Sequence, residues 1–223
     1  MFDFSKVPLP DYSRKEDIIN SVSHAVGVPV CIAALIMCFI KLGSDITPLQ
    51  IFTMLLCGAC SIILYAGSAF YHGLKPGKLK KIARVLDHSN IFLMITGCMS
   101  VFFLMCYIDY NRTLAIIMFI VSWVLTLLGI FLTFMDQERF KKVQMVMYIF
   151  LGWLILIGAK TVWQSSDDGK KFMIFVAVGG ASYLIGAVLY GIGKKRPYVH
   201  CVFHIFVLMG TLFQFAGLYL YLI

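Results

Sequence analysis

Charged side chains are scarce in this chain of 223 residues, of which 13% are charged and 61% are hydrophobic. Soluble domains have about 25% charged residues, so the composition excludes a water-soluble globule, a disordered chain and a small disulfide-bonded scaffold. Acidic residues are scarcer than basic ones, 11 against 19, which gives a net charge of +8. In so apolar a chain, we interpret this excess as a signal of membrane orientation and not of nucleic-acid binding.

Alternation of polar and apolar residues is also missing, which excludes the strands of an outer-membrane barrel. The apolar runs are continuous, as in 116–121, and a helix needs about 20 apolar residues to cross a bilayer. We therefore predict an all-α bundle of seven transmembrane helices. The expected spans cover residues 22–40, 49–72, 88–108, 113–135, 143–160, 172–191 and 198–222.

The first 20 residues have no apolar run, so we expect no cleavable signal peptide, and the first span serves as the insertion signal. The chain has no low-complexity tract and no obvious short repeat. We therefore expect a single integral membrane domain over residues 1–223. Its expected location is the plasma membrane, which it would cross several times.

Lysine and arginine are unevenly divided between the two sets of alternate loops. Only five of the 19 fall in the loops after the first, third and fifth spans, namely Lys41, Arg112, Lys160, Lys170 and Lys171. Because short loops with the excess of positive charge stay in the cytoplasm, we predict a cytoplasmic N-terminus and a C-terminus outside the cell.

All five histidines then fall near the predicted cytoplasmic ends of the spans. His200 and His204 are four residues apart, so both rings project from one helix face and can bind the same metal ion. Ser68 and His72 have the same spacing at the end of the second span. Asp87 follows at the predicted start of the third span, and a carboxylate there that faced the bundle interior would be a functional candidate.

These residues predict a zinc site formed by His72, His200 and His204. Three protein ligands leave a fourth position for water, as in catalytic zinc sites, and zinc makes hydroxide available at neutral pH. Asp87 would hold or activate this water, and Ser68 would hydrogen-bond nearby. The alternative interpretation is that the histidines are interfacial and bind backbone groups or lipid headgroups.

A second polar group precedes the first span, where Glu16, Asn20 and His24 recur every four residues. These side chains could support the metal site from outside its ligands. The alternative is an amphipathic turn whose polar side faces water. The pair Cys57 and Cys60 has metal-site spacing, but it lies in an apolar span without a second pair, so we interpret these cysteines as buried hydrophobic residues.

Four segments together resemble the bacterial hemolysin III family, which belongs with the progestin and adiponectin receptors and more loosely with alkaline ceramidases. They are EDIINSVSH (16–24), SAFYH (68–72), LDHSNIF (86–92) and HCVFHIFVLMG (200–210). The resemblance implies seven helices and a cytoplasm-facing zinc ion held by His72, His200 and His204, with Asp87 on the water and Ser68 beside it. It also implies hydrolysis of a lipid amide or ester, ceramide-like in the receptor relatives.

Three functions are consistent with these observations. The first is a zinc-dependent hydrolase of a membrane lipid. The second is a membrane-disrupting or pore-forming protein, as the family name suggests, and the third is a lipid-sensing receptor with structural zinc. A retinal-binding pump is disfavoured, because the last span has no lysine for a Schiff base. The sequence specifies neither the substrate nor the oligomeric state.

Overall fold

The computed structural model describes residue 4, residues 7–193 and residues 196–223, and within these ranges the chain is helical and has no strand. The α-helices are α1 (Arg14–Ala25), α2 (Gly27–Leu42), α3 (Pro48–Gly73), α4 (Lys78–Val101), α5 (Arg112–Trp153), α6 (Leu156–Ser165), α7 (Asp167–Gly193) and α8 (Val199–Gly217). A 3₁₀-helix follows α2 at Gly43–Asp45. π-Helices follow α4 at Phe102–Tyr107 and α8 at Leu218–Leu222. The prediction of an all-helical chain is confirmed.

Six helical segments in the described residues are long and apolar enough to cross a membrane, so the chain is a multi-pass membrane protein. They are Arg14–Asp45, Pro48–Gly73, Lys78–Tyr107, Arg112–Ser165, Asp167–Gly193 and Val199–Leu222. Two of the seven predicted spans, 113–135 and 143–160, fall within the single segment Arg112–Ser165. This segment is not regular throughout, because Asp136 has a non-helical backbone (φ −165°, ψ 97°) inside α5.

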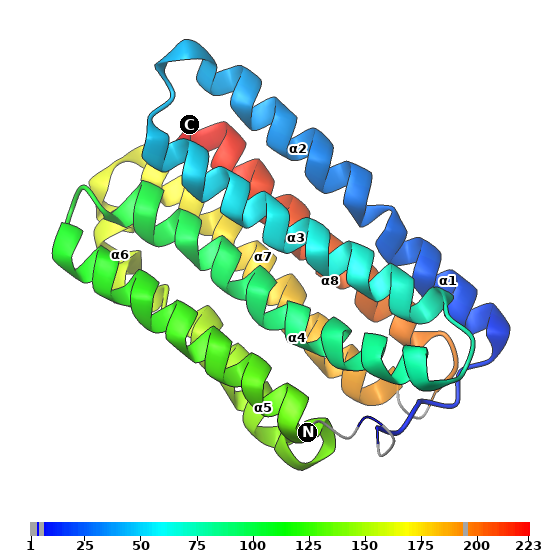
Figure 1. The fold of residues 1–223 in the computed structure, drawn as a ribbon. Helices are drawn as coiled ribbons and strands as arrows, with labels where there is room; N and C mark the ends of the chain where they lie inside the picture. Colours follow the sequence, from blue (N-terminus) through cyan, green and yellow to red (C-terminus); the bar gives the residue numbers. More distant parts are fainter. Residues whose placement is uncertain (1–3, 5–6, 194–195) are drawn as a thin grey trace.

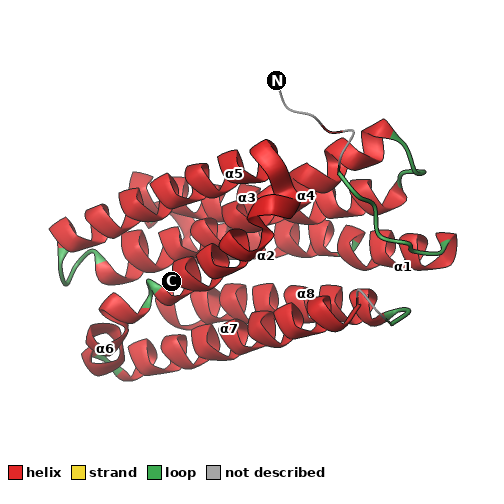
Figure 2. Cartoon of the chain, turned by 90° about the horizontal axis from the view of Figure 1, so that it is seen from below, coloured by secondary structure: helices red, strands yellow, loops and turns green. Residues whose placement is uncertain are grey.

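The helices form two layers. Figure 2 shows α7 and α8 side by side in one layer and α3, α4 and α5 in the other, with α6 at one end. Helix α2 lies outside α3 (Figure 1). Tyr65 of α3 connects the layers by a hydrogen bond of 2.6 Å to the Thr211 hydroxyl of α8, and within the second layer Tyr183 of α7 lies 3.0 Å from the same hydroxyl. Long side chains therefore bridge the layers where the backbones do not approach closely.

Four chain segments meet at one end of the bundle, at the lower right of Figure 1: the start of α1, the α3–α4 loop, the bend of α5 and the α7–α8 loop. Glu16 Oε1 accepts a hydrogen bond of 3.0 Å from the backbone N–H of Tyr198. Arg14 donates to the carbonyl of Gly73 at 3.1 Å. These contacts hold the termini of α1, α3 and α8 together at the end where the histidines lie.

Helix α4 begins at Lys78, ten residues earlier than the predicted span 88–108. The predicted start of this span was therefore wrong, because residues 78–87 are already helical. The helix extends because its early cations have partners in other segments: Lys80 binds Asp17 of α1, and Arg84 donates to the carbonyl of Pro8.

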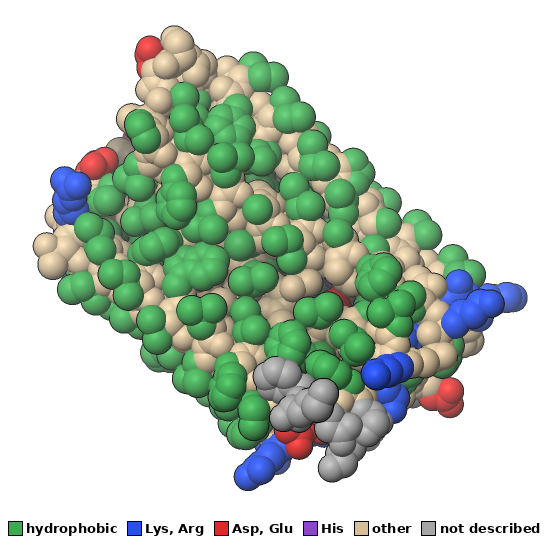
Figure 3. Space-filling view, viewed as in Figure 1, with side chains coloured by type: hydrophobic (Ala, Val, Ile, Leu, Met, Phe, Trp, Pro, Cys, Tyr) green, Lys and Arg blue, Asp and Glu red, His purple; other side chains and the backbone are tan. Residues whose placement is uncertain are grey.

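The surface of the bundle is apolar over most of its length, as lipid contact requires. On the face shown in Figure 3, hydrophobic side chains cover the middle and charged side chains gather near the two ends. Helix α1 has the reverse arrangement from a soluble helix, with Ile18 and Val22 exposed and Asp17, Asn20 and His24 buried. Its polar face therefore points into the bundle, which argues against the alternative of a polar face in water.

Candidate metal centre

Three histidines from two helices meet inside one end of the bundle. His72 lies in the last turn of α3, and His200 and His204 lie one turn apart at the start of α8. Each offers a ring nitrogen within 4.8 Å of the others. Their exposures are 0%, 7% and 1%. Three buried imidazoles at this spacing could hold one metal ion, and the structure thus brings together the three predicted ligands.

Some nitrogens of these rings have partners, while others are buried without one. The Nδ1 atom of His72 lies 3.2 Å from a carboxylate oxygen of Asp17, and that of His204 lies 3.2 Å from the backbone carbonyl of Asn20. By contrast, His72 Nε2 and His200 Nδ1 are buried and have no hydrogen-bond partner among the described residues. Buried polar atoms are nearly always bonded in native proteins, so these two nitrogens are available as metal ligands.

Asp87 and Ser68 lie next to the cluster but are not part of its three ligands. Ser68 precedes His72 by one turn of α3, and its hydroxyl lies beside the Asp87 carboxylate of α4. Both side chains line the same cavity as His200 and His204. The adjacent His88 lies outside the cluster, with its Nε2 atom 3.1 Å from the Tyr190 hydroxyl.

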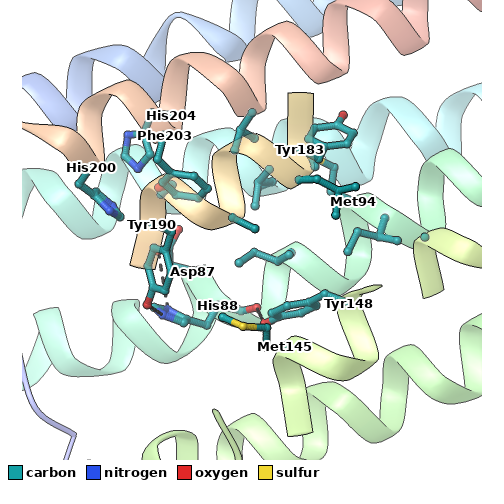
Figure 4. Close-up of a pocket in the computed structure, with 18 of the residues that line it drawn as sticks. Asp87, His88, Met94, Met145, Tyr148, Tyr183, Tyr190, His200, Phe203 and His204 are labelled. Carbon is teal, nitrogen blue, oxygen red and sulfur yellow. Dashed lines mark hydrogen bonds and ion pairs between the residues drawn. The ribbon is translucent and has the colours of Figure 1, made fainter. Parts of the chain in front are cut away.

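The cluster lies at one end of a large cavity between the two layers, with a volume of about 1120 Å³. Figure 4 shows Asp87, His200 and His204 near one end, and Met94 and Tyr183 deeper along the helices. Beyond the histidines the lining is mostly apolar. It includes Ile91, Met94, Ile95, Met99, Ile155, Met173, Val176 and Val207. A cavity with a few polar groups at one end and apolar walls fits an amphipathic ligand.

Helix α1 supplies a polar wall behind the histidines. The His24 ring stacks on that of His204, with centroids 3.6 Å apart, and the Asn20 side chain is buried nearby. Glu16, the third residue of the predicted stripe, lies instead in the N-terminal capping box with Ser13. The stripe that faces inward is Asp17, Asn20 and His24, which have the i, i+3 and i+7 spacing of one helix face.

Sequence reasoning missed Asp17 and Ser23, which contact His72 and His204 directly. The Ser23 hydroxyl lies 2.9 Å from the Nδ1 atom of His204. The i, i+3, i+7 pattern could have identified Asp17, since it includes the same Asn20 and His24. Ser23 gives no such signal, because it lies outside this i, i+3, i+7 pattern.

Tyr12 was also missed, because it precedes α1 in a segment without regular structure. Its ring centroid lies 5.2 Å from that of His200 and 5.9 Å from that of His72. Burial raises the pKa of the Tyr12 phenol above its ordinary value, with Tyr190 adding to the effect, so the hydroxyl remains a hydrogen-bond donor. Together with Pro8 and Leu9, Tyr12 lines the cavity at the histidine end.

Comparison with known proteins gives the same family over almost the whole chain. The model of the family described as "Haemolysin-III related" matches residues 12–215. The chain is 30% identical to Hemolysin-3 of Bacillus cereus over 209 residues, 94% of this chain and 93% of that protein. It is also 30% identical to the Hemolysin-3 homolog of Bacillus subtilis (strain 168) over 204 residues, 92% and 93% of the two chains. The chain belongs to the haemolysin-III-related family of membrane proteins.

Proposed function

We propose that this protein is a zinc-dependent hydrolase that cleaves an amide or ester bond of a membrane lipid at the cytoplasmic side of the plasma membrane. The observation that carries the proposal is the group of three buried histidines at the polar end of a large apolar cavity.

The proposed topology has seven spans, with the N-terminus in the cytoplasm. At 1.5 Å per residue, the 54 residues of Arg112–Ser165 would extend about 80 Å, far more than a hydrocarbon core of about 30 Å. The non-helical Asp136 lies between two apolar halves, and both halves contact α4 at Phe92. A turn at Asp136 supports two passes in place of one. It also brings Arg139, Lys141 and Lys142 to the same end as the other basic loops.

Zinc is the metal that we propose, because imidazole is one of its usual ligands and three protein ligands are typical of catalytic zinc sites. The residues fit such an ion: two ring nitrogens, His72 Nε2 and His200 Nδ1, are buried without partners. When bound, zinc supplies a Lewis acid for a carbonyl group and a source of hydroxide at neutral pH.

Asp87 is the proposed general base of the reaction. It accepts a proton from the attacking water and passes it to the amine or alcohol that leaves when the acyl bond breaks, so that the products are a carboxylic acid and that amine or alcohol. Ser68, whose hydroxyl lies beside Asp87, would hold this carboxylate in place. The apolar walls of the cavity take the hydrocarbon chain, which leaves the polar bond at the histidine end.

A membrane-disrupting activity is the second candidate, and the names of the two Bacillus relatives favour it. A pore would need polar side chains along the whole path through the bilayer. The deep part of the cavity is instead lined by Met99, Ile155 and Val176. We therefore rank lysis below hydrolysis.

Elemental analysis of purified protein in lipid nanodiscs tests the proposal. We expect one zinc ion per chain in the wild type and a loss of zinc in His204→Ala. His88→Ala is the matched control and should keep its zinc, because His88 lies outside the cluster.

The wild type should also release fatty acid from a lipid extract, as measured by mass spectrometry, and His204→Ala should not. A wild type purified without chelators that contains no metal would refute the metal site. Equal release by both proteins would refute hydrolysis, and ion flux through wild-type liposomes would support the lytic alternative.

A further inference from the structure

A buried ion pair contacts the Nδ1 side of the His72 ring. One carboxylate oxygen of Asp17 lies 3.2 Å from His72 Nδ1, and the other binds the ammonium group of Lys80. Asp17 and Lys80 are 5% and 3% exposed. These three residues come from α1, α3 and α4, so the contact joins three helices at the metal centre.

The Asp17–Lys80 ion pair determines which nitrogen of the His72 ring carries the proton. A carboxylate that binds an ammonium group is ionised and can only accept hydrogen bonds. His72 must therefore donate through an Nδ1–H group, and in the neutral ring this leaves the lone pair on Nε2. That Nε2 atom is the buried nitrogen without a partner.

The same pair holds the end of the helix that carries His72. His72 is the residue before the last one of α3, where helices fray. Lys80 also donates to the carbonyl of Leu74 at 3.1 Å, just after the helix end, and Arg14 donates to that of Gly73 at 3.1 Å. The last turn of α3 is thus held from both α1 and α4.

We propose that Asp17 and Lys80 are positioning residues of the metal centre, which keep His72 in its Nδ1–H tautomer with Nε2 directed at the metal. This inference rests on the proposed function. It adds a prediction about metal affinity, because carboxylates that orient ligand histidines raise it about 10–100-fold. A buried ion pair by itself is weak support for a stabilising role, since apolar residues often replace one without loss of stability.

The first test uses metal-free wild-type protein labelled with ¹⁵N-histidine, in which only five residues give signals. His72→Asn identifies the His72 signals. We expect nitrogen shifts and N–H couplings of a neutral ring protonated at Nδ1. A ring protonated at Nε2, or one that exchanges between tautomers, would overturn the proposal whether or not the protein binds zinc.

The second test measures zinc affinity by competition with a chromogenic chelator. Asp17→Leu should weaken binding about 10–100-fold. Asp17→Asn should weaken it less, because its amide oxygen can still accept the Nδ1–H hydrogen bond, and Lys80→Met should fall between wild type and Asp17→Leu. Asp167→Asn and Lys170→Met remove an exposed pair of 3.1 Å at the start of α7 and should change nothing. Zinc binding by Asp17→Leu within twofold of wild type would refute the positioning role. A wild type that binds no zinc would refute the proposed function and leave only the His72 tautomer, which the first test measures.

Discussion

Gly129 of α5 is a position where one methyl group should destabilise the fold. A Cβ atom built there would lie 2.3 Å from Cζ and 2.4 Å from Cε1 of the Phe92 ring of α4. The ring has no room to retreat, because Phe92 is fully buried and its centroid is 4.3 Å from that of Tyr148 on the other half of α5. Substitution by alanine must therefore push the first half of α5 away from α4.

The expected cost follows from two opposing effects. Overpacking a core costs about 1–3 kcal/mol, while alanine gains up to about 1 kcal/mol over glycine in a helix. We expect Gly129→Ala to lose about 1–2 kcal/mol net. For a chain of this length, that corresponds to a fall in melting temperature of about 2–8 °C.

The assay is thermal unfolding in one detergent, followed by tryptophan fluorescence. Gly180→Ala is the matched control, because it lies inside α7 with nothing within 4 Å of the added Cβ atom, and its melting temperature should stay the same or rise. Phe92→Leu should cost less stability in the Gly129→Ala background than in the wild type, since the smaller side chain relieves the clash. If Gly129→Ala is as stable as Gly180→Ala, the two halves of α5 do not enclose Phe92, and the proposed turn at Asp136 loses its main support.

Two further predictions concern other contacts. Thr96 and Thr126 are fully buried and hydrogen-bond to each other between α4 and α5, so Thr126→Val should cost about 1–3 kcal/mol by leaving the Thr96 hydroxyl without this partner. The double variant with valine at both positions should regain most of that loss in thermal unfolding, and equal losses in the single and double variants would contradict this explanation. Tyr12→Ala should speed the removal of metal by a water-soluble chelator up to about tenfold, because the ring covers His72 and His200 and aromatic contacts are worth about 0.5–1.5 kcal/mol. Tyr110→Ala, an exposed tyrosine in the α4–α5 connection, is the control, and equal rates in all three proteins would exclude a covering role for Tyr12.

Much of the helical order and the histidine group followed from the sequence, because both depend on local patterns. Runs of about 20 apolar residues mark helices in a membrane, and the predicted span 49–72 differs from α3 by one residue at each end. The i, i+4 spacing of His200 and His204 puts both rings on one face whatever surrounds them. The sequence could also suggest His72 as the third ligand, since a site needs more donors than one helix turn offers.

The missed residues depend on contacts between distant segments, which periodicity does not report. From the sequence, Lys80 was grouped with the cations of the cytoplasmic loops. In the structure it is buried against Asp17, which lies 63 residues earlier in the chain. The start of α4 was predicted too late for the same reason. Lysine and arginine lower the hydropathy of its first turns, so the sequence gives no sign of a buried helix there. The burial becomes favourable only through the partners that these cations find in the fold. Tyr12 follows Pro8, whose carbonyl accepts a hydrogen bond from Arg84, and its ring lies against His200 at the start of α8, so its position depends on these contacts and not on its own sequence.

The distribution of unpaired polar atoms distinguishes a binding site from ordinary packing. Each buried polar atom without a partner costs about 1–3 kcal/mol, and an apolar bundle could avoid that cost with hydrophobic side chains. Seven of the ten such side-chain atoms in the described residues nevertheless belong to five neighbouring residues around the cluster, namely Asn20, His24, Tyr71, His72 and His200. Packing defects would be scattered along the helices, whereas these atoms lie at one end of the cavity and include two nitrogens of the proposed ligands. Their concentration therefore favours a polar ligand or metal at this end over a purely structural role for the histidines.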